Sequence, residues 1–166
     1  MKNAEINADR FMGFADVYDN ARPTLLAHFM ELIRLYLGRD IGTVVDLGCG
    51  TGLSTAAWKG NCGKVIGIEP SSDMLAVARE KSGEGVEFRQ GYSHATGLSD
   101  GCADAVVCSQ SFHWMEPVST LKEADRILAP GGVFATVDCD WPATGLRHGA
   151  GIRLRGAFRK GKAPGA

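Results

Sequence analysis

The stretch Val44-Val45-Asp46-Leu47-Gly48-Cys49-Gly50-Thr51-Gly52 decides the fold of this chain. An apolar, largely β-branched run ends in a carboxylate, three glycines follow at alternate positions, and residues 53–58 can begin a helix. A strand, a glycine turn and a helix in this order are how an open α/β sheet builds a nucleotide pocket beside its first strand. Glycines allow positive φ angles and a close ligand, and the N–H groups at a helix start face that ligand.

The carboxylate of Asp46 indicates which kind of ligand this turn suits. The glycine spacing is GxGxG rather than GxGxxG, and no Gly-Lys-Ser or Gly-Lys-Thr follows, so the turn is not a P-loop. A carboxylate here would repel a pyrophosphate but could accept hydrogen bonds from an ammonium group. The pattern therefore favours a nucleoside-like cofactor with a cationic amino-acid tail over NAD. A purely structural strand-to-helix turn is the alternative.

A second strand, residues 64–68, ends at Glu69, which is followed by Pro70. An acid at this point can accept hydrogen bonds from both hydroxyls of a ribose. The alternative is a solvated charge at the end of a strand. Met74, in the helix that follows, could line an adenine slot, although a helical Met is more often part of the core.

Strands alternate with helices along the rest of the chain. A helix is expected after Pro23, ending near Gly38, and another after Pro117. Further strands are expected at residues 86–89, 103–108 and 133–137, the last preceded by a Pro130-Gly131-Gly132 turn. This order predicts an α/β fold with a parallel sheet and right-handed crossovers.

Composition limits the classes of protein that the chain can belong to. The 166 residues are 45% hydrophobic and 22% charged, which suits one soluble domain with a substantial core. No apolar run approaches the roughly 18–20 residues that span a bilayer, and the first residues lack an apolar signal core. We therefore expect a cytoplasmic protein without a membrane segment. Five cysteines without a Cys-x-x-Cys pair argue against a disulfide framework and a zinc site, so no metal is expected.

The last 26 residues differ from the rest. Residues 1–140 hold all 19 acidic residues, whereas residues 141–166 hold six basic residues, six glycines and no acid. This change predicts a tail without regular structure and a truncated or out-of-frame terminus near Trp141. Six charges are a weak basis for the alternative, an arm that binds nucleic acid or a membrane.

Five segments together resemble a known family: VVDLGCGTG (44–52), VIGIEPSSDML (65–75), VEFRQG (86–91), ADAVVCSQSFHW (103–114) and LKEADRILAPGGVF (121–134). In order and spacing they are similar to class I S-adenosylmethionine-dependent methyltransferases of the methyltransferase type 11 group. The resemblance covers about residues 11–140. It implies a doubly wound, Rossmann-like sheet of order 3-2-1-4-5, with the cofactor across the carboxyl ends of the strands and a lid in residues 1–22.

The resemblance also implies roles for individual residues. The methionine part of S-adenosylmethionine would be held by Asp46, Gly48, Cys49 and Gly50. The ribose would be held by Glu69, with Met74 near the adenine. Gln110 would close the pocket, and Tyr18 and Arg22 would belong to the lid. His113 could orient the substrate or accept a proton, or could be a structural loop residue packed on Trp114.

Two departures from the family pattern stand out. Many relatives have Gly-Asp-Ala after the third strand, where this chain has Gly91-Tyr92-Ser93, so only Ser93 could still offer backbone contacts to the adenine. The family also continues past the fifth strand with a helix and an antiparallel hairpin, which we expect to be lacking here.

The interpretation that follows is methyl transfer from S-adenosylmethionine to a small-molecule acceptor. Nucleic acid is not expected as a partner. The alternatives are a cofactor-binding fragment without activity and, with less support, an NAD-dependent oxidoreductase. The pattern specifies neither the acceptor atom nor the oligomeric state.

Overall fold

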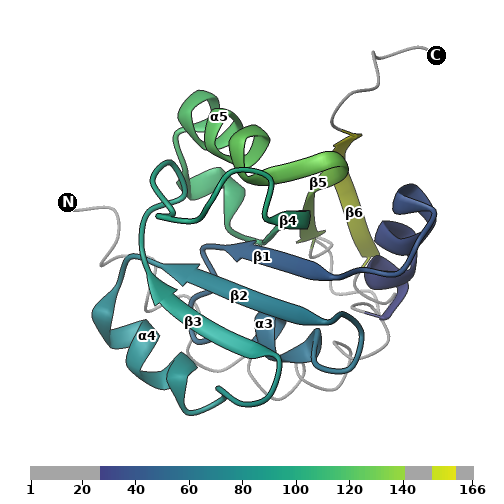
Figure 1. Cartoon of the computed structure of the whole chain (residues 1–166). Helices are drawn as coiled ribbons and strands as arrows, with labels where there is room; N and C mark the ends of the chain where they lie inside the picture. Colours follow the sequence, from purple (N-terminus) through teal and green to yellow (C-terminus); the bar gives the residue numbers. More distant parts are fainter. Residues whose placement is uncertain (1–26, 141–150, 160–166) are drawn as a thin grey trace.

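The computed structural model describes residues 27–140 and 151–159, which form one six-stranded sheet with helices on both faces (Figure 1). The strands are β1 (Thr43–Leu47), β2 (Lys64–Glu69), β3 (Val86–Gln90), β4 (Ala103–Ser109), β5 (Leu128–Asp140) and β6 (Gly151–Arg159). The helices are residues 27–37, α3 (Leu53–Ala57), α4 (Ser72–Arg79), the 3-10 turn η2 (Phe112–Trp114) and α5 (Pro117–Ile127).

The strand order is β3-β2-β1-β4-β5-β6, which confirms the predicted order 3-2-1-4-5. β1 lies parallel to β2 on one side and to β4 on the other. The chain therefore winds outward from β1 in two opposite directions, and doubly wound sheets have their crevice where the direction reverses, which is here the carboxyl ends of β1 and β4. Ligands of doubly wound sheets bind at this point.

The two faces of the sheet carry separate cores. Val44 of β1 belongs to a cluster with Phe29 and Trp58, under the helix of residues 27–37 and α3. Val45 and Leu47 point to the opposite face, where Ile127 of α5 covers them. Both clusters are buried, and this burial on both faces explains why β1, β2 and β4 are almost continuously apolar.

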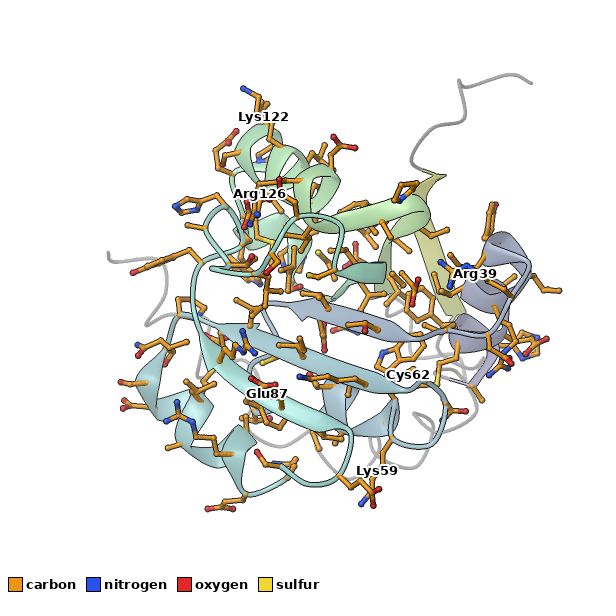
Figure 2. All side chains as sticks on the ribbon, in the orientation of Figure 1. Arg39, Lys59, Cys62, Glu87, Lys122 and Arg126 are labelled. Atoms are coloured by element: carbon orange, nitrogen blue, oxygen red, sulfur yellow. The ribbon has the colours of Figure 1, made fainter. Side chains whose placement is uncertain are left out.

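Arg39, Glu87 and Arg126, labelled in Figure 2, are charged side chains that form ion pairs outside the glycine loop. Arg126 of α5 pairs with Glu123 and Asp100, and a second pair joins Arg39 to Asp104. Asp104 also accepts hydrogen bonds from the N–H groups just before β1, at the end of the sheet away from the crevice. These pairs hold the scaffold together and are not part of the crevice.

The start of β5 is irregular where the sequence predicts a turn. Leu128 pairs with Ala103 and Val133 with Ala105, so residues 129–132 stand opposite a single residue of β4. Gly131 has a φ of 76° in this excursion. The Pro-Gly-Gly turn therefore exists as a bulge inside one long strand rather than as a separate loop before it.

The prediction of a tail without regular structure is wrong for residues 151–159. These residues form β6, which runs antiparallel to β5, from Gly151 opposite Asp140 to Arg159 opposite Val133. The alternation of Ile152 and Leu154 with Arg153 is the period of a strand, and the glycine and arginine content obscured it. Residues 141–150 and 160–166, and the predicted lid with Tyr18 and Arg22, lie outside the described residues. Within the described ranges, no helix is long and apolar enough to cross a membrane.

Candidate functional site

The glycine loop after β1 folds back onto the end of β2. The N–H groups of Gly48 and Cys49 both donate to the Ile68 carbonyl oxygen, at 2.8 and 3.1 Å. The Gly52 N–H donates to the Cys49 carbonyl at 2.9 Å, which closes the turn just before α3. The loop is therefore held in one conformation by its own backbone.

Close neighbours leave no room for a Cβ at Gly48 or Gly52, whereas a Cβ at Gly50 would have space. A Cβ on Gly48 would lie 2.8 Å from Cβ of Ser111, and one on Gly52 would lie 2.6 Å from Cζ of Phe88. A Cβ on Gly50 would meet nothing closer than Sδ of Met74, at 3.8 Å. All three glycines have positive φ, at 69°, 56° and 81° in chain order. Gly50 is thus the point where a ligand can approach the backbone.

Asp46 is fully buried beneath this loop. Its Oδ2 accepts hydrogen bonds from Oγ of Ser54 and Oγ1 of Thr55, both at 2.7 Å. The carboxylate therefore joins β1 to the first turn of α3. The sequence reasoning missed both hydroxyl residues, although they stand only two and three positions after the third glycine. The predicted contact between Asp46 and a cationic ligand stays a prediction, since the side chain has no exposed surface here.

Glu69 connects the end of β2 to the glycine loop. Its Oε2 accepts a hydrogen bond from the Gly50 N–H and its Oε1 from the Ser71 N–H, each at 2.9 Å. The side chain is 7% exposed. A carboxylate has about four acceptor sites, so two remain for other donors. Ser71 also caps α4, which places the half-exposed Met74 beside Gly50. The structure therefore brings Gly50, Glu69 and Met74 together.

The opposite wall of the crevice follows β4. Gln110 has a φ of 56°, the one non-glycine residue with a positive φ among the described residues, and its N–H donates to the Val137 carbonyl at 2.8 Å. Backbone held in this region costs about 1–3 kcal/mol and is concentrated at functional sites. Next to it, Oγ of the buried Ser111 donates to the Leu47 carbonyl at 2.6 Å. This hydrogen bond fastens the two walls together where the winding direction reverses.

Ser93 lies in the loop after β3 and is tied to α5. Its Oγ and the Oγ1 of Thr120 are 2.8 Å apart and share a hydrogen bond. The neighbouring Tyr92 is exposed and stacks on His94, with ring centroids 5.4 Å apart. Ser93 is thus fixed against α5, and its predicted backbone contact with the adenine stays a prediction.

His113 lies in η2, two residues after Ser111. Its Nδ1 is 3.7 Å from Oδ1 of Asp138, at the far end of β5, and its ring lies 4.7 Å from that of Trp114. Asp138 is not among the site residues that the sequence indicates. The separation of 25 residues hid the proximity of these side chains.

The cysteine thiol in the glycine loop points away from any ligand. A Cβ added to Gly67 would lie 2.8 Å from Sγ of Cys49, which places that thiol against β2. Burial raises the pKa of the Cys49 thiol, and the Asp46 and Glu69 carboxylates raise it further. A neutral, buried thiol is inert, so Cys49 can contribute only its backbone to a site.

The chemistry of the loop fits a cationic nucleoside better than a phosphate. Residues 44–54 and 69–75 contain three carboxylates, Asp46, Glu69 and Asp73, and no Lys or Arg, so a pyrophosphate would have no basic partner on them. The free acceptor sites of Glu69 suit hydroxyl donors. Among the described residues, no group of three His, Cys, Asp or Glu side chains could hold a metal ion.

Comparison with known proteins agrees with this reading of the site. The family model described as "Methyltransferase domain" matches residues 45–136. Over 120 residues the chain is 32% identical to the uncharacterized methyltransferase Rv3342 of Mycobacterium tuberculosis, covering 72% of this chain and 48% of that protein. Over 125 residues it is 30% identical to the Saccharomyces cerevisiae protein described as "Probable S-adenosylmethionine-dependent methyltransferase CRG1", covering 71% and 43%.

A solved structure of a geranyl diphosphate methyltransferase, in complex with GPP and sinefungin, superposes with a TM-score of 0.58. It is 26% identical, and the match covers 69% of this chain and 45% of that one. The chain spans about half the length of the curated relatives that it matches.

Proposed function

This chain belongs to the methyltransferase domain family, and we propose that it transfers the methyl group of S-adenosylmethionine to a small-molecule acceptor. The cofactor supplies a methyl group on a positively charged sulfur, which is already a reactive electrophile. The protein's task is therefore mainly to bind the cofactor, align the acceptor and keep water away.

The observation that carries the proposal is the contact between Glu69 and the glycine loop. The carboxylate sits at the end of β2, next to the switch point, and it accepts the Gly50 N–H while keeping acceptor sites for further donors. A ribose offers two adjacent hydroxyl donors, which a carboxylate can accept together. The same hydrogen bonds hold the loop in place before any ligand arrives, so binding does not have to order it.

The remaining predicted residues surround this contact in the proposal. The backbone of Gly48, Cys49 and Gly50 would hold the methionine part, and Met74 would lie against the adenine. Asp46 would act from beneath, because its hydrogen bonds to α3 position the N–H groups at the start of that helix. Its negative charge also favours a cationic ligand at short range.

The acceptor would bind on the wall formed after β4. Gln110 closes the cofactor pocket in this proposal, and its left-handed backbone directs the chain into η2, which stands at the mouth of the crevice. Support for a small-molecule acceptor comes from the geranyl diphosphate methyltransferase, which shares the fold. Ser93 remains a candidate for backbone contact with the adenine, from the loop braced against α5.

Calorimetric titration of the full chain tests the proposal. We expect S-adenosylhomocysteine to bind and NAD not to bind. Glu69→Gln should weaken S-adenosylhomocysteine binding by about 10- to 100-fold, since hydrogen bonds to a charged group contribute roughly 1.5–3 kcal/mol. Glu84→Gln, the same change at an exposed glutamate before β3, is the matched control and should have no effect.

The outcomes separate the rival functions. Binding of NAD alone would overturn the proposal in favour of an oxidoreductase. Binding of S-adenosylhomocysteine by the wild type and by Glu69→Gln with equal affinity would remove Glu69 from the site. Cofactor binding without transfer to any of a panel of small-molecule acceptors would support the alternative of a binding domain without activity.

A further inference from the structure

We propose that His113 and Asp138 form a proton-accepting pair, in which Asp138 holds the imidazole so that its Nε2 takes the proton released by the methyl acceptor. This inference rests on the proposed methyl transfer and adds the class of acceptor. His113 would be the catalytic residue and Asp138 the positioning residue.

The pair lies at the carboxyl edge of the sheet, beside the glycine loop. His113 follows Ser111 by two residues, and Ser111 packs on Gly48 and donates to the Leu47 carbonyl. Asp138 follows Val137, whose carbonyl accepts the Gln110 N–H. The backbone next to each member of the pair is therefore held by a hydrogen bond, from Ser111 to β1 and from Gln110 to β5, which limits how far the two can move apart.

The two side chains differ in exposure, and one particular nitrogen of the imidazole faces the carboxylate. The side chain of Asp138 is 18% exposed and that of His113 is 51% exposed. Nδ1 of His113 is 3.7 Å from Oδ1 of Asp138. The Nδ1 side of the more exposed ring therefore faces the less exposed carboxylate. The distance is longer than a hydrogen bond, as is common for catalytic pairs before their substrate is bound.

A neutral imidazole donates from one nitrogen and accepts with the other. If Nδ1–H points to Asp138, the lone pair is on Nε2, which is then the proton acceptor. Asp138 also stabilises the imidazolium that forms when Nε2 takes a proton, because a nearby carboxylate attracts the positive charge. The largely exposed indole of Trp114, next to the ring, offers an apolar wall for the acceptor.

The step balances without any further reactant. A lone pair on the acceptor's oxygen or nitrogen forms a bond to the methyl carbon while the carbon–sulfur bond breaks. The electron pair of that bond stays on sulfur, which becomes a neutral thioether. The acceptor's proton passes to Nε2 of His113 and then to water. Such a pair is useful only for an acceptor whose nucleophilic atom carries both a lone pair and a proton, such as a hydroxyl group or a neutral primary or secondary amine.

The test measures the tautomer of His113 in the full chain, without substrate. Protein labelled with 15N in histidine is examined by long-range 1H–15N correlation in alkaline buffer, at a pH where the 15N shifts show the ring to be neutral. A His113→Gln variant assigns the signal. We expect the wild type to carry its proton on Nδ1, and Asp138→Asn to change the ratio of the two tautomers at least tenfold toward Nε2–H.

Two further variants make the result specific. Asp138→Glu keeps a carboxylate and should retain the Nδ1–H form. Asp40→Asn removes an exposed carboxylate far from the crevice and should leave the spectrum unchanged. Wild-type protein with the proton on Nε2, or an Asp138→Asn variant with an unchanged ratio, would overturn the inference. If Asp138→Asn does not fold, the wild-type tautomer decides alone.

The same samples separate this inference from the proposed function. If S-adenosylhomocysteine binds in the calorimeter, the tautomer result judges the His113–Asp138 pair alone. If it does not bind, the proposed methyl transfer fails whatever the tautomer.

Discussion

Replacement of Gly52 by alanine tests the packing of the glycine loop most directly. Gly52 has a φ of 81°, and an added Cβ would lie 2.6 Å from Cζ of Phe88 and 3.0 Å from Cβ of Ala78. Phe88 is buried in the core beneath the loop, so its ring has little room to withdraw. Gly60 offers a matched control, because its φ is 78° and a Cβ there would meet nothing within 4 Å.

Both variants place an alanine in a left-handed backbone conformation, but only Gly52→Ala brings a new Cβ against Phe88. A left-handed conformation costs an alanine about 1–2 kcal/mol, and the stiffer unfolded chain returns roughly 0.4–1 kcal/mol. Gly60→Ala should therefore lower the free energy of unfolding by about 0–1.5 kcal/mol. Gly52→Ala should lower it by a further ~1–3 kcal/mol, which is the usual effect of forcing an extra carbon into a packed core.

Urea denaturation followed by circular dichroism measures both values. A Phe88→Leu background shortens the side chain that the new Cβ meets, so the additional loss caused by Gly52→Ala should shrink there. Equal losses for Gly52→Ala and Gly60→Ala, within about 0.5 kcal/mol, would show that the loop is held by backbone conformation alone and that the contact with Phe88 is unimportant.

Three further changes probe other parts of the scaffold and site. The hydrogen bond from Arg126, and then those from Thr96, lower the pKa of Glu123 from its ordinary 4.5 to about 2. Glu123 therefore stabilises the fold above about pH 4.5, and this stabilisation is lost as the pH falls toward 2. Urea titrations at several pH values should show the free energy of unfolding of the wild type exceeding that of Glu123→Gln by about 3 kcal/mol less at the low end of this pH range than at the high end. A difference that does not change with pH would contradict this. Thr55→Val removes one hydroxyl donor from the buried Asp46 and should lower the free energy of unfolding in urea by about 1.5–3 kcal/mol, whereas no loss would mean that the carboxylate is satisfied without it. Gln110→Gly relieves a left-handed backbone, so stability in urea should rise by up to about 1 kcal/mol while calorimetry shows weaker S-adenosylhomocysteine binding; lower stability would contradict the strain.

The elements that could be predicted from the sequence are those with a local cause. The run before Asp46 is β-branched and apolar, which is sufficient for a buried parallel strand, and the glycines mark the turn within a few residues. Glu69 follows from the same logic, since a polar residue directly after an apolar strand lies at the carboxyl edge. Alternation of strands and helices predicts a parallel sheet with right-handed crossovers, whereas the strand order came from the resemblance to class I methyltransferases.

The features that escaped prediction depend on distance in the sequence. The hydrogen bond from Ser111 to Leu47 spans 64 positions, and the approach of His113 to Asp138 spans 25. Neither has a local signature, because both depend on how the two halves of the sheet meet. β6 was missed for another reason: its glycines and arginines have low strand propensity, and pairing with β5 outweighs it.

The contact between Gly48 and Ser111 also bears on how the sequence can vary. A Cβ at position 48 would fall 2.8 Å from that of Ser111, so the two positions share room for a single side-chain carbon. An alanine at 48 would also need a φ of 69° and would lie 2.9 Å from Cε of Met115, so glycine at 111 relieves only part of the conflict, at the loss of the hydroxyl that donates to the Leu47 carbonyl. A combinatorial library randomised at both positions should therefore return glycine at 48 whatever residue stands at 111, and that constancy would mark the point where the two halves of the sheet diverge.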